Sequence, residues 1–190
     1  MPAYSSVPTH HFISQILLIH LSPNIVYINR NISKVYQYHG LNALQTKHGA
    51  EGYSTLAVPC NQFHFEEPAW SGVELMDGLK YVRPGDGFIP KFPLTQKIDV
   101  NGIHEHPMYT FLKSQCPPAT RVVVQPVLYS PIYTEDVRWN YEKFLVGPDG
   151  KALYRYDASV DPATDVELNA DIRSELAKLK ANVAASPLVG

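Results

Sequence analysis

Two adjacent side chains, Trp139 and Asn140, stand directly before an apolar run and could bind one ligand atom together. The indole N–H and the carboxamide N–H₂ are different kinds of hydrogen-bond donor, and neighbouring residues can direct both to a single point. A structural interpretation stays open, in which Trp139 packs in a core and Asn140 caps a turn. The pair is a candidate for polar recognition, and its surroundings decide between the two.

The chain holds two cysteines, Cys60 and Cys116. A thiol reacts as its thiolate, so a reactive cysteine needs surroundings that lower its pKa. Cys60 follows a predicted buried strand, where cysteine is usually an inert packing residue. Cys116 adjoins two prolines at the end of a predicted helix, away from the Trp139–Asn140 pair. We expect neither thiol to be the nucleophile, and two cysteines imply no disulfide framework.

Composition excludes several classes of function. The 190 residues are 45% hydrophobic and 18% charged with a net charge of −2, which fits one globular domain and no nucleic-acid partner. No window reaches the roughly 18 apolar residues of a membrane helix. Residues 12–21 resemble a signal-peptide core, but no Lys or Arg precedes them. His104 and His106 alone are weak evidence for zinc, so we predict no metal.

The apolar pattern predicts the elements that position these residues. A strand, a helix and a second strand fall within the first sixty residues, which indicates a crossover unit with parallel pairing. Gly49 is expected to end that helix in the left-handed conformation. A hairpin and an amphipathic helix follow the Trp139–Asn140 pair. We expect strands at residues 16–21, 25–28, 53–58, 142–146 and 151–156, and helices at residues 38–49, 73–81, 106–114 and 168–179.

Two motifs are long enough to indicate a family: LAVPCNQF at residues 56–63 and WNYEKFLVGPDG at residues 139–150. The first resembles the pattern L-x-F-P-C-N-Q-F of the glutathione peroxidase family, and the second resembles that family's WNFEKFLVGPDG nearly residue for residue. Residues 78–84 and 100–102 also resemble family segments. The likeness runs from about residue 37 to the final helix, so we expect an atypical segment at 1–36 and a glutathione peroxidase domain at 37–190.

The resemblance implies an α/β, thioredoxin-like fold, with a mixed central sheet flanked by helices and an incomplete N-terminal hairpin. It implies reduction of hydrogen peroxide and organic hydroperoxides by glutathione in the response to oxidative stress, without a bound cofactor. Residues 79–90 resemble the loop of tetrameric members, and Cys116 with its two prolines resembles the secreted plasma branch. The resemblance thus implies a homotetramer and an extracellular protein, with a cytoplasmic one as the alternative.

The family's reacting atom has no counterpart in the chain. Members carry a selenol or thiol on the loop after the first core strand, held as an anion by N–H donors from a Gln, a Trp and an Asn. Trp139 and Asn140 match the last two. The chalcogen position falls near Asn31 or Ile32, and neither side chain is a nucleophile.

The family glutamine is also replaced. The pattern F-G-x-Q-E-P corresponds here to FHFEEP at residues 63–68, so Glu66 stands at the Gln position. A carboxylate offers no donor and repels a neighbouring anion, which would raise a thiol's pKa. We therefore expect the chain as written to be inactive, and we keep as the alternative a non-catalytic thioredoxin-like subunit that assembles through residues 79–90.

Two arginines match those that receive the glutathione carboxylates in the family, Arg83 and Arg155. A guanidinium fork suits a carboxylate, but a solvated surface charge explains each arginine equally well.

The part of the chain that does not resemble the family is one contiguous segment, residues 1–36. Since a selenocysteine codon reads as a stop, our hypothesis is that a faulty reading of the gene replaced this segment, which sequencing of the messenger RNA would test.

Overall fold

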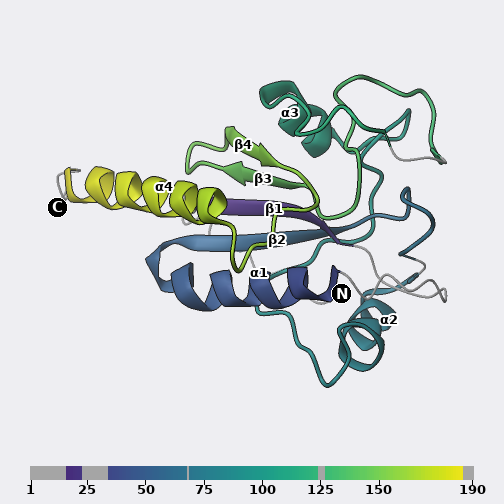
Figure 1. Cartoon of the computed structure of the whole chain (residues 1–190), viewed down its shortest axis with the longest axis horizontal. Coiled ribbons are helices and arrows are strands. Elements are labelled where there is room, and N and C mark those ends of the chain that lie inside the picture. Colours follow the sequence, from purple (N-terminus) through teal and green to yellow (C-terminus); the bar gives the residue numbers. More distant parts are fainter. Residues whose placement is uncertain (1–15, 23–33, 68, 124–126, 186–190) are drawn as a thin grey trace, which may run out of the picture.

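The computed structural model describes residues 16–22, 34–67, 69–123 and 127–185. In this part of the chain a sheet lies at the centre and helices cover it, as Figure 1 shows. The predicted strand at residues 25–28 lies outside the described residues. No helix of the described residues is both long and apolar enough to cross a membrane.

The described strands form a mixed four-stranded sheet in the order β2–β1–β3–β4. The strand β1 (Ile16–Ser22) pairs in parallel with β2 (Tyr53–Pro59) and antiparallel with β3 (Lys143–Val146). The hairpin partner β4 (Ala152–Tyr156) completes the sheet beside β3. The parallel pairing and the final hairpin are confirmed.

The crossover between the parallel strands contains α1 (Val35–His48), as predicted. The helix ends before Gly49 as expected, but the left-handed conformation expected of this glycine is wrong: its φ is −56°, and it opens a short 3₁₀ turn, η2 (Gly49–Glu51). The left-handed residue is Gly52, with φ +99°, whose N–H donates to the carbonyl of Gly49. The extra turn moves the left-handed position three residues along the chain, directly before β2.

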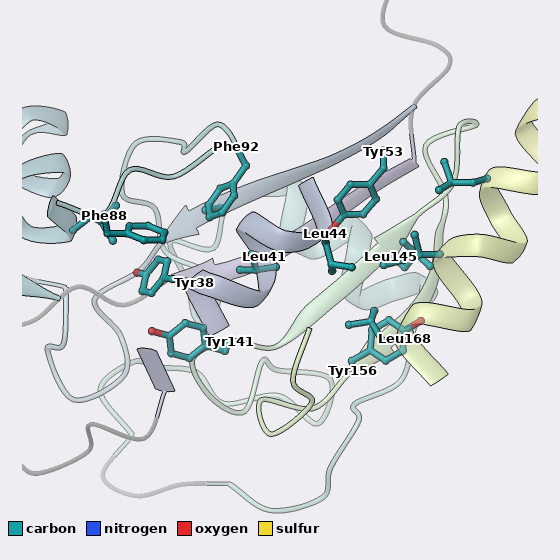
Figure 2. Packing of buried hydrophobic residues seen from close by; sticks show 14 of the residues in the cluster. Tyr38, Leu41, Leu44, Tyr53, Phe88, Phe92, Tyr141, Leu145, Tyr156 and Leu168 are labelled. Atoms are coloured by element: carbon teal, nitrogen blue, oxygen red, sulfur yellow. The ribbon is translucent and has the colours of Figure 1, made fainter. Parts of the chain in front are cut away.

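The two faces of the sheet carry separate hydrophobic clusters. Leu145 faces the cluster formed with α1 and with α4 (Val166–Ala185), which Figure 2 shows from close by. Phe144 faces the opposite cluster, which includes α3 (Pro107–Gln115). Successive strand residues point to opposite faces, so β3 contributes to both. The predicted apolar stripe of the last helix is confirmed, since its members are all buried: Leu168, Ile172, Leu176 and Leu179.

A helical segment protrudes beside the sheet at the lower right of Figure 1. It consists of α2 (Gly72–Asp77) and the π-helical turn η3 (Gly78–Val82), close to the predicted helix at residues 73–81. Ser71 caps α2 by accepting the N–H of Glu74. The segment leads into residues 79–90, the expected assembly loop.

Candidate functional site

The carboxyl end of β2 and the amino end of β3 lie at the same edge of the sheet. This follows from the register, because β1 runs parallel to β2 and antiparallel to β3, with His20 opposite both Ala57 and Lys143. Residues 60–67 leave β2 at this edge, and residues 138–142 enter β3 there. The topology therefore brings the two family-like motifs together.

A hydrogen bond joins the two motifs directly. Asn140 Nδ2 donates to Glu66 Oε2 at 2.8 Å, across 74 residues of sequence. Asn140 is 1% exposed, and its Oδ1 is a buried atom with no hydrogen-bond partner among the described residues. The sequence-predicted Glu66 and Asn140 thus occupy one site, and the carboxylate uses a donor of the carboxamide.

Trp139 lies at the rim of this site. Its side chain is half-buried and meets two rings of the β2 loop edge to face: His64, with centroids 4.8 Å apart, and Phe63, at 5.8 Å. The structural interpretation of Trp139 is therefore partly right, because the indole packs against the core cluster next to Phe63.

Three basic groups surround the Glu66 carboxyl. Burial raises the pKa of Glu66 above the ordinary value of a glutamate, whereas His64, the Asn140 hydrogen bond, Arg83 and Lys34 oppose that shift. Arg83, predicted from the sequence, is half-buried at the end of η3. Lys34 precedes α1 and donates to the carbonyl of Ala158 at 3.1 Å. The charge of the site therefore depends on the protonation of Glu66.

Strained backbone is concentrated at the site. Among the described residues four non-glycine residues have positive φ, and three of them are here: His64, Phe65 and Tyr141. His64 stands where the family pattern has glycine, the residue that enters this conformation most easily. The Tyr141 ring meets Tyr38 edge to face at 5.8 Å, and both hydroxyls point to the same side in Figure 2. Such strain persists where surrounding contacts fix the backbone.

A buried polar network holds the two loops of the site in register. Gln62 Nε2 donates to the carbonyl of Asn101 at 2.8 Å, and Gln62 Oε1 accepts the N–H groups of Val100 and Asn101. The Asn101 side chain in turn exchanges two hydrogen bonds of 2.9 Å with the backbone of Val137. The loop after β2 and the segment before Trp139 are therefore linked through one asparagine.

Neither cysteine is a thiolate candidate in this structure. Cys60 is fully buried, and burial raises the pKa of its thiol to about 12. Its Sγ contacts the backbone N–H and the carboxamide of Gln62. Burial also raises the pKa of Cys116, whose Sγ donates to the carbonyl of Ala152 at 3.5 Å. The predicted chalcogen position near Asn31 or Ile32 lies outside the described residues.

Arg155 is placed differently from the expectation for a ligand-binding arginine. Its side chain is 1% exposed, and Nε donates to Glu142 Oε2 at 2.7 Å. The other guanidinium nitrogens donate to three backbone carbonyls, those of Cys116, Glu135 and Asp136. Its donors are directed into the protein, so the geometry favours a structural role over capture of a glutathione carboxylate.

Sequence reasoning missed His64, Lys34 and Tyr141. A signal existed for His64, because a histidine at a glycine position beside a replaced glutamine marks two changes in one loop. Nothing in the sequence pointed to Lys34. No group of three or more His, Cys, Asp or Glu side chains suited to a metal ion occurs among the residues that the structure describes.

Comparisons with known proteins agree with this geometry. The family model described as "Glutathione peroxidase" matches residues 8–113, more than half of the chain. Glutathione peroxidase 3 of Rattus norvegicus is 49% identical over 122 residues, which cover 63% of this chain and 54% of the relative. The epididymal secretory glutathione peroxidase of Mus musculus is 44% identical over 146 residues, 76% of this chain and 64% of the relative. The chain thus spans little more than half the length of the first relative.

Solved structures support the fold. T. cruzi GPX1 aligns with a TM-score of 0.59 and 23% identity over 90% of this chain and 88% of that one. Trgpx in its apo form aligns with a TM-score of 0.56 and 24% identity over 88% and 84% of the two chains. The α/β, thioredoxin-like fold predicted from the motifs is confirmed, and the chain belongs to the glutathione peroxidase family.

Proposed function

We propose that this protein serves in the reduction of hydroperoxides with glutathione as the electron donor. The observation that carries the proposal is the contact between Asn140 and Glu66, which assembles the two family motifs at one sheet edge with Trp139 at the rim. The indole N–H and the carboxamide N–H₂ are the two donors that we propose for a reacting anion.

The proposed chemistry needs one chalcogen atom. A selenolate or thiolate attacks a peroxide oxygen and breaks the O–O bond, which gives the selenenic or sulfenic acid and releases the alcohol after proton transfer. Two glutathione thiols then return the acid to the selenol or thiol, with glutathione disulfide and water as products. Donors at Trp139 and Asn140 would stabilise the anion before attack.

The 190-residue chain does not itself supply that atom, on three grounds. It holds two cysteines, both are buried, and burial raises the pKa of each. Asn31 and Ile32 have no nucleophilic group. Glu66 adds a negative charge where an anion would form. We therefore propose that the chain as written is inactive and that its site becomes competent when a chalcogen is restored.

Arg83 is the arginine that we propose for a glutathione carboxylate. Its half-buried position at the end of η3 supports this proposal, as does its charge, which opposes the rise in the pKa of Glu66 caused by burial. Arg155, by contrast, points into the protein. Of the two predicted arginines, we therefore propose only Arg83 for glutathione binding.

An NADPH-coupled assay with glutathione, glutathione reductase and hydrogen peroxide tests the function. We expect no turnover by the unchanged chain and measurable turnover by Ile32→Cys or Asn31→Cys, increased further by Glu66→Gln. Trp139→Phe in the active variant should lower the rate, with Trp70→Phe as the matched control because Trp70 is 92% exposed. Turnover by the unchanged chain that disappears in Cys60→Ser would contradict the proposal.

The second candidate is a non-catalytic subunit that assembles through residues 79–90 as a homotetramer. Exposed apolar side chains favour it: Tyr81 is 67%, Val82 56% and Ile89 62% exposed. Light scattering on the eluting peak of a sizing column measures the mass. We expect a multimer that Ile89→Lys dissociates, and a monomer at all concentrations would exclude assembly through this loop.

A further inference from the structure

We propose that Glu66 controls, through one proton, whether the site accepts an anionic ligand, and that it does so by occupying the Asn140 carboxamide. The proposal goes beyond hydroperoxide reduction because it concerns binding. It rests on the proposed function only for the identity of the natural anion, since glutathione carries carboxylates and a thiol that ionises.

The first ground is the hydrogen-bond arrangement of Asn140. Its Nδ2 donates to Glu66 Oε2 at 2.8 Å, while its buried Oδ1 has no partner within the described part of the chain. An unpaired buried acceptor is costly and calls for an explanation. Protonation of Glu66 would relieve this cost, because the carboxyl O–H could donate to Oδ1 once the carboxamide turns over. The observed arrangement is therefore the one that fits the ionised carboxylate.

The second ground is the charge around the carboxyl. His64 on the same loop, Arg83 at the end of η3 and Lys34 before α1 all act on Glu66 as cations, and the nearby Tyr141 phenol is neutral because burial raises its pKa. Ionised Glu66 offsets these basic groups and takes a hydrogen-bond donor from Asn140. Neutral Glu66 no longer offsets these basic groups and no longer accepts from the Asn140 N–H₂, so the site becomes more positive and attracts an anion.

The third ground is access. His64 is exposed and Trp139 half-buried, so solvent reaches the rim where their rings meet at 4.8 Å. A small anion at this rim would lie beside the rings of Trp139 and His64, next to the carboxyl on which the basic groups act. The site would then discriminate by ligand charge, admitting anions when Glu66 is protonated and rejecting them when it is ionised.

Titration of the ¹⁵N-labelled full chain tests the proposal by NMR, without turnover. The Asn140 side-chain N–H₂ resonances, assigned by their loss in Asn140→Ser, should shift with pH at a midpoint above that of an ordinary glutamate. In Glu66→Gln this shift should disappear. The His64→Gln variant should keep the shift, because it retains both the Glu66 carboxyl and the Asn140 carboxamide.

Sulfate is the probe for the anion. At pH 7.5 we expect Glu66→Gln to bind sulfate about tenfold more tightly than the unchanged chain, since removal of one nearby charge at the surface is worth about that factor. The matched control is Glu74→Gln, an exposed glutamate on α2 that accepts the N–H of Trp70, and it should change nothing.

Two results would overturn the proposal: Asn140 resonances that do not respond to the titration of Glu66, or equal sulfate affinity in Glu66→Gln and the unchanged chain. If Glu66→Gln failed to fold, the titration of the unchanged chain and of His64→Gln would still decide. Loss of hydroperoxide turnover in an active variant would bear on the proposed function alone, because neither readout here depends on turnover.

Discussion

Arg155 Nε donates to Glu142 Oε2 at 2.7 Å, with both side chains almost completely buried. Glu142 Oε1 accepts the backbone N–H of Arg138, so this one carboxylate joins β4 to the segment before β3. The guanidinium also lies over the Phe144 ring, 5.0 Å from its centroid. Arg155 resembles a ligand-binding residue in sequence, but in the structure its side chain is buried against Glu142 and Phe144.

Arg155→Ala should lower the free energy of unfolding by about 3–5 kcal/mol, because it leaves Glu142 as an unpaired buried charge. Urea unfolding monitored by circular dichroism measures this loss. The double variant with Glu142→Gln should recover part of it. An Arg155→Ala protein of normal stability with weakened glutathione binding would instead return the residue to the ligand site.

Cys60 should be unreactive towards a thiol reagent such as Ellman's reagent in the folded protein. At pH 8 a pKa of about 12 leaves about a thousandfold less thiolate than the pKa of 9 of an ordinary cysteine, and burial blocks access as well. Cys116→Ser isolates this thiol for the measurement. Reaction at full rate after unfolding in urea is the positive control, and rapid labelling of the native state would show that Cys60 can act as a nucleophile.

Lys143 should make stability rise with pH above neutrality. Burial, then the nearby Lys34 charge, lowers the pKa of this fully buried lysine to about 7 from 10.5. Between those values the unfolded chain binds the extra proton, so unfolding free energy increases with pH by up to about 1.4 kcal/mol per pH unit. Below pH 7 Lys143 is charged in the folded protein as well, so the free energy of unfolding carries the full cost of burying that charge.

Urea unfolding at a series of pH values between 6 and 10 measures the slope for Lys143. Lys143→Met should abolish it and remove the hydrogen bonds that Nζ donates to the carbonyls of Tyr141 and Val160 at 2.7 and 2.9 Å. Lys151→Met, at a lysine whose side chain is 67% exposed, should keep the slope. A flat profile for the unchanged chain would refute the assignment.

Gly102 should resist substitution for two separable reasons. Its φ is +79°, and an added Cβ would lie 3.0 Å from the carbonyl oxygen of Ser130. Gly102→Ala should therefore cost about 1–3 kcal/mol of unfolding free energy. Gly87→Ala has a similar φ of +76° with open space around it, and so measures the backbone strain alone. Equal costs for both would show that the contact with Ser130 contributes nothing.

Much of the fold could be predicted from the sequence because the patterns of burial are local. The stripe of α4 and the short apolar run of β3 follow the periods of helix and strand, and the parallel pairing of β1 and β2 follows from one intervening helix. Gly49 shows the limit. Which of two nearby glycines becomes left-handed depends on whether a 3₁₀ turn extends the helix, and no residue pattern marks that.

The site was predicted only in part, for a physical reason. Trp139, Asn140 and Glu66 could be found because they fall within motifs, and the structure brings all three together. Arg155 could not be assigned, since its partner Glu142 becomes a neighbour through the hairpin pairing of β3 with β4. The acidity of a group depends on burial and on distant charges, which local sequence does not contain.

The position of β1 between β2 and β3 affects how readily the protein aggregates. Each of its edges is hydrogen-bonded, one to a parallel and the other to an antiparallel neighbour. Proteolytic removal of residues 1–22 would uncover two facing rows of backbone N–H and C=O groups, the kind of edge through which chains associate into intermolecular sheets. By pairing along both of its sides, β1 therefore keeps this sheet from recruiting strands of other molecules.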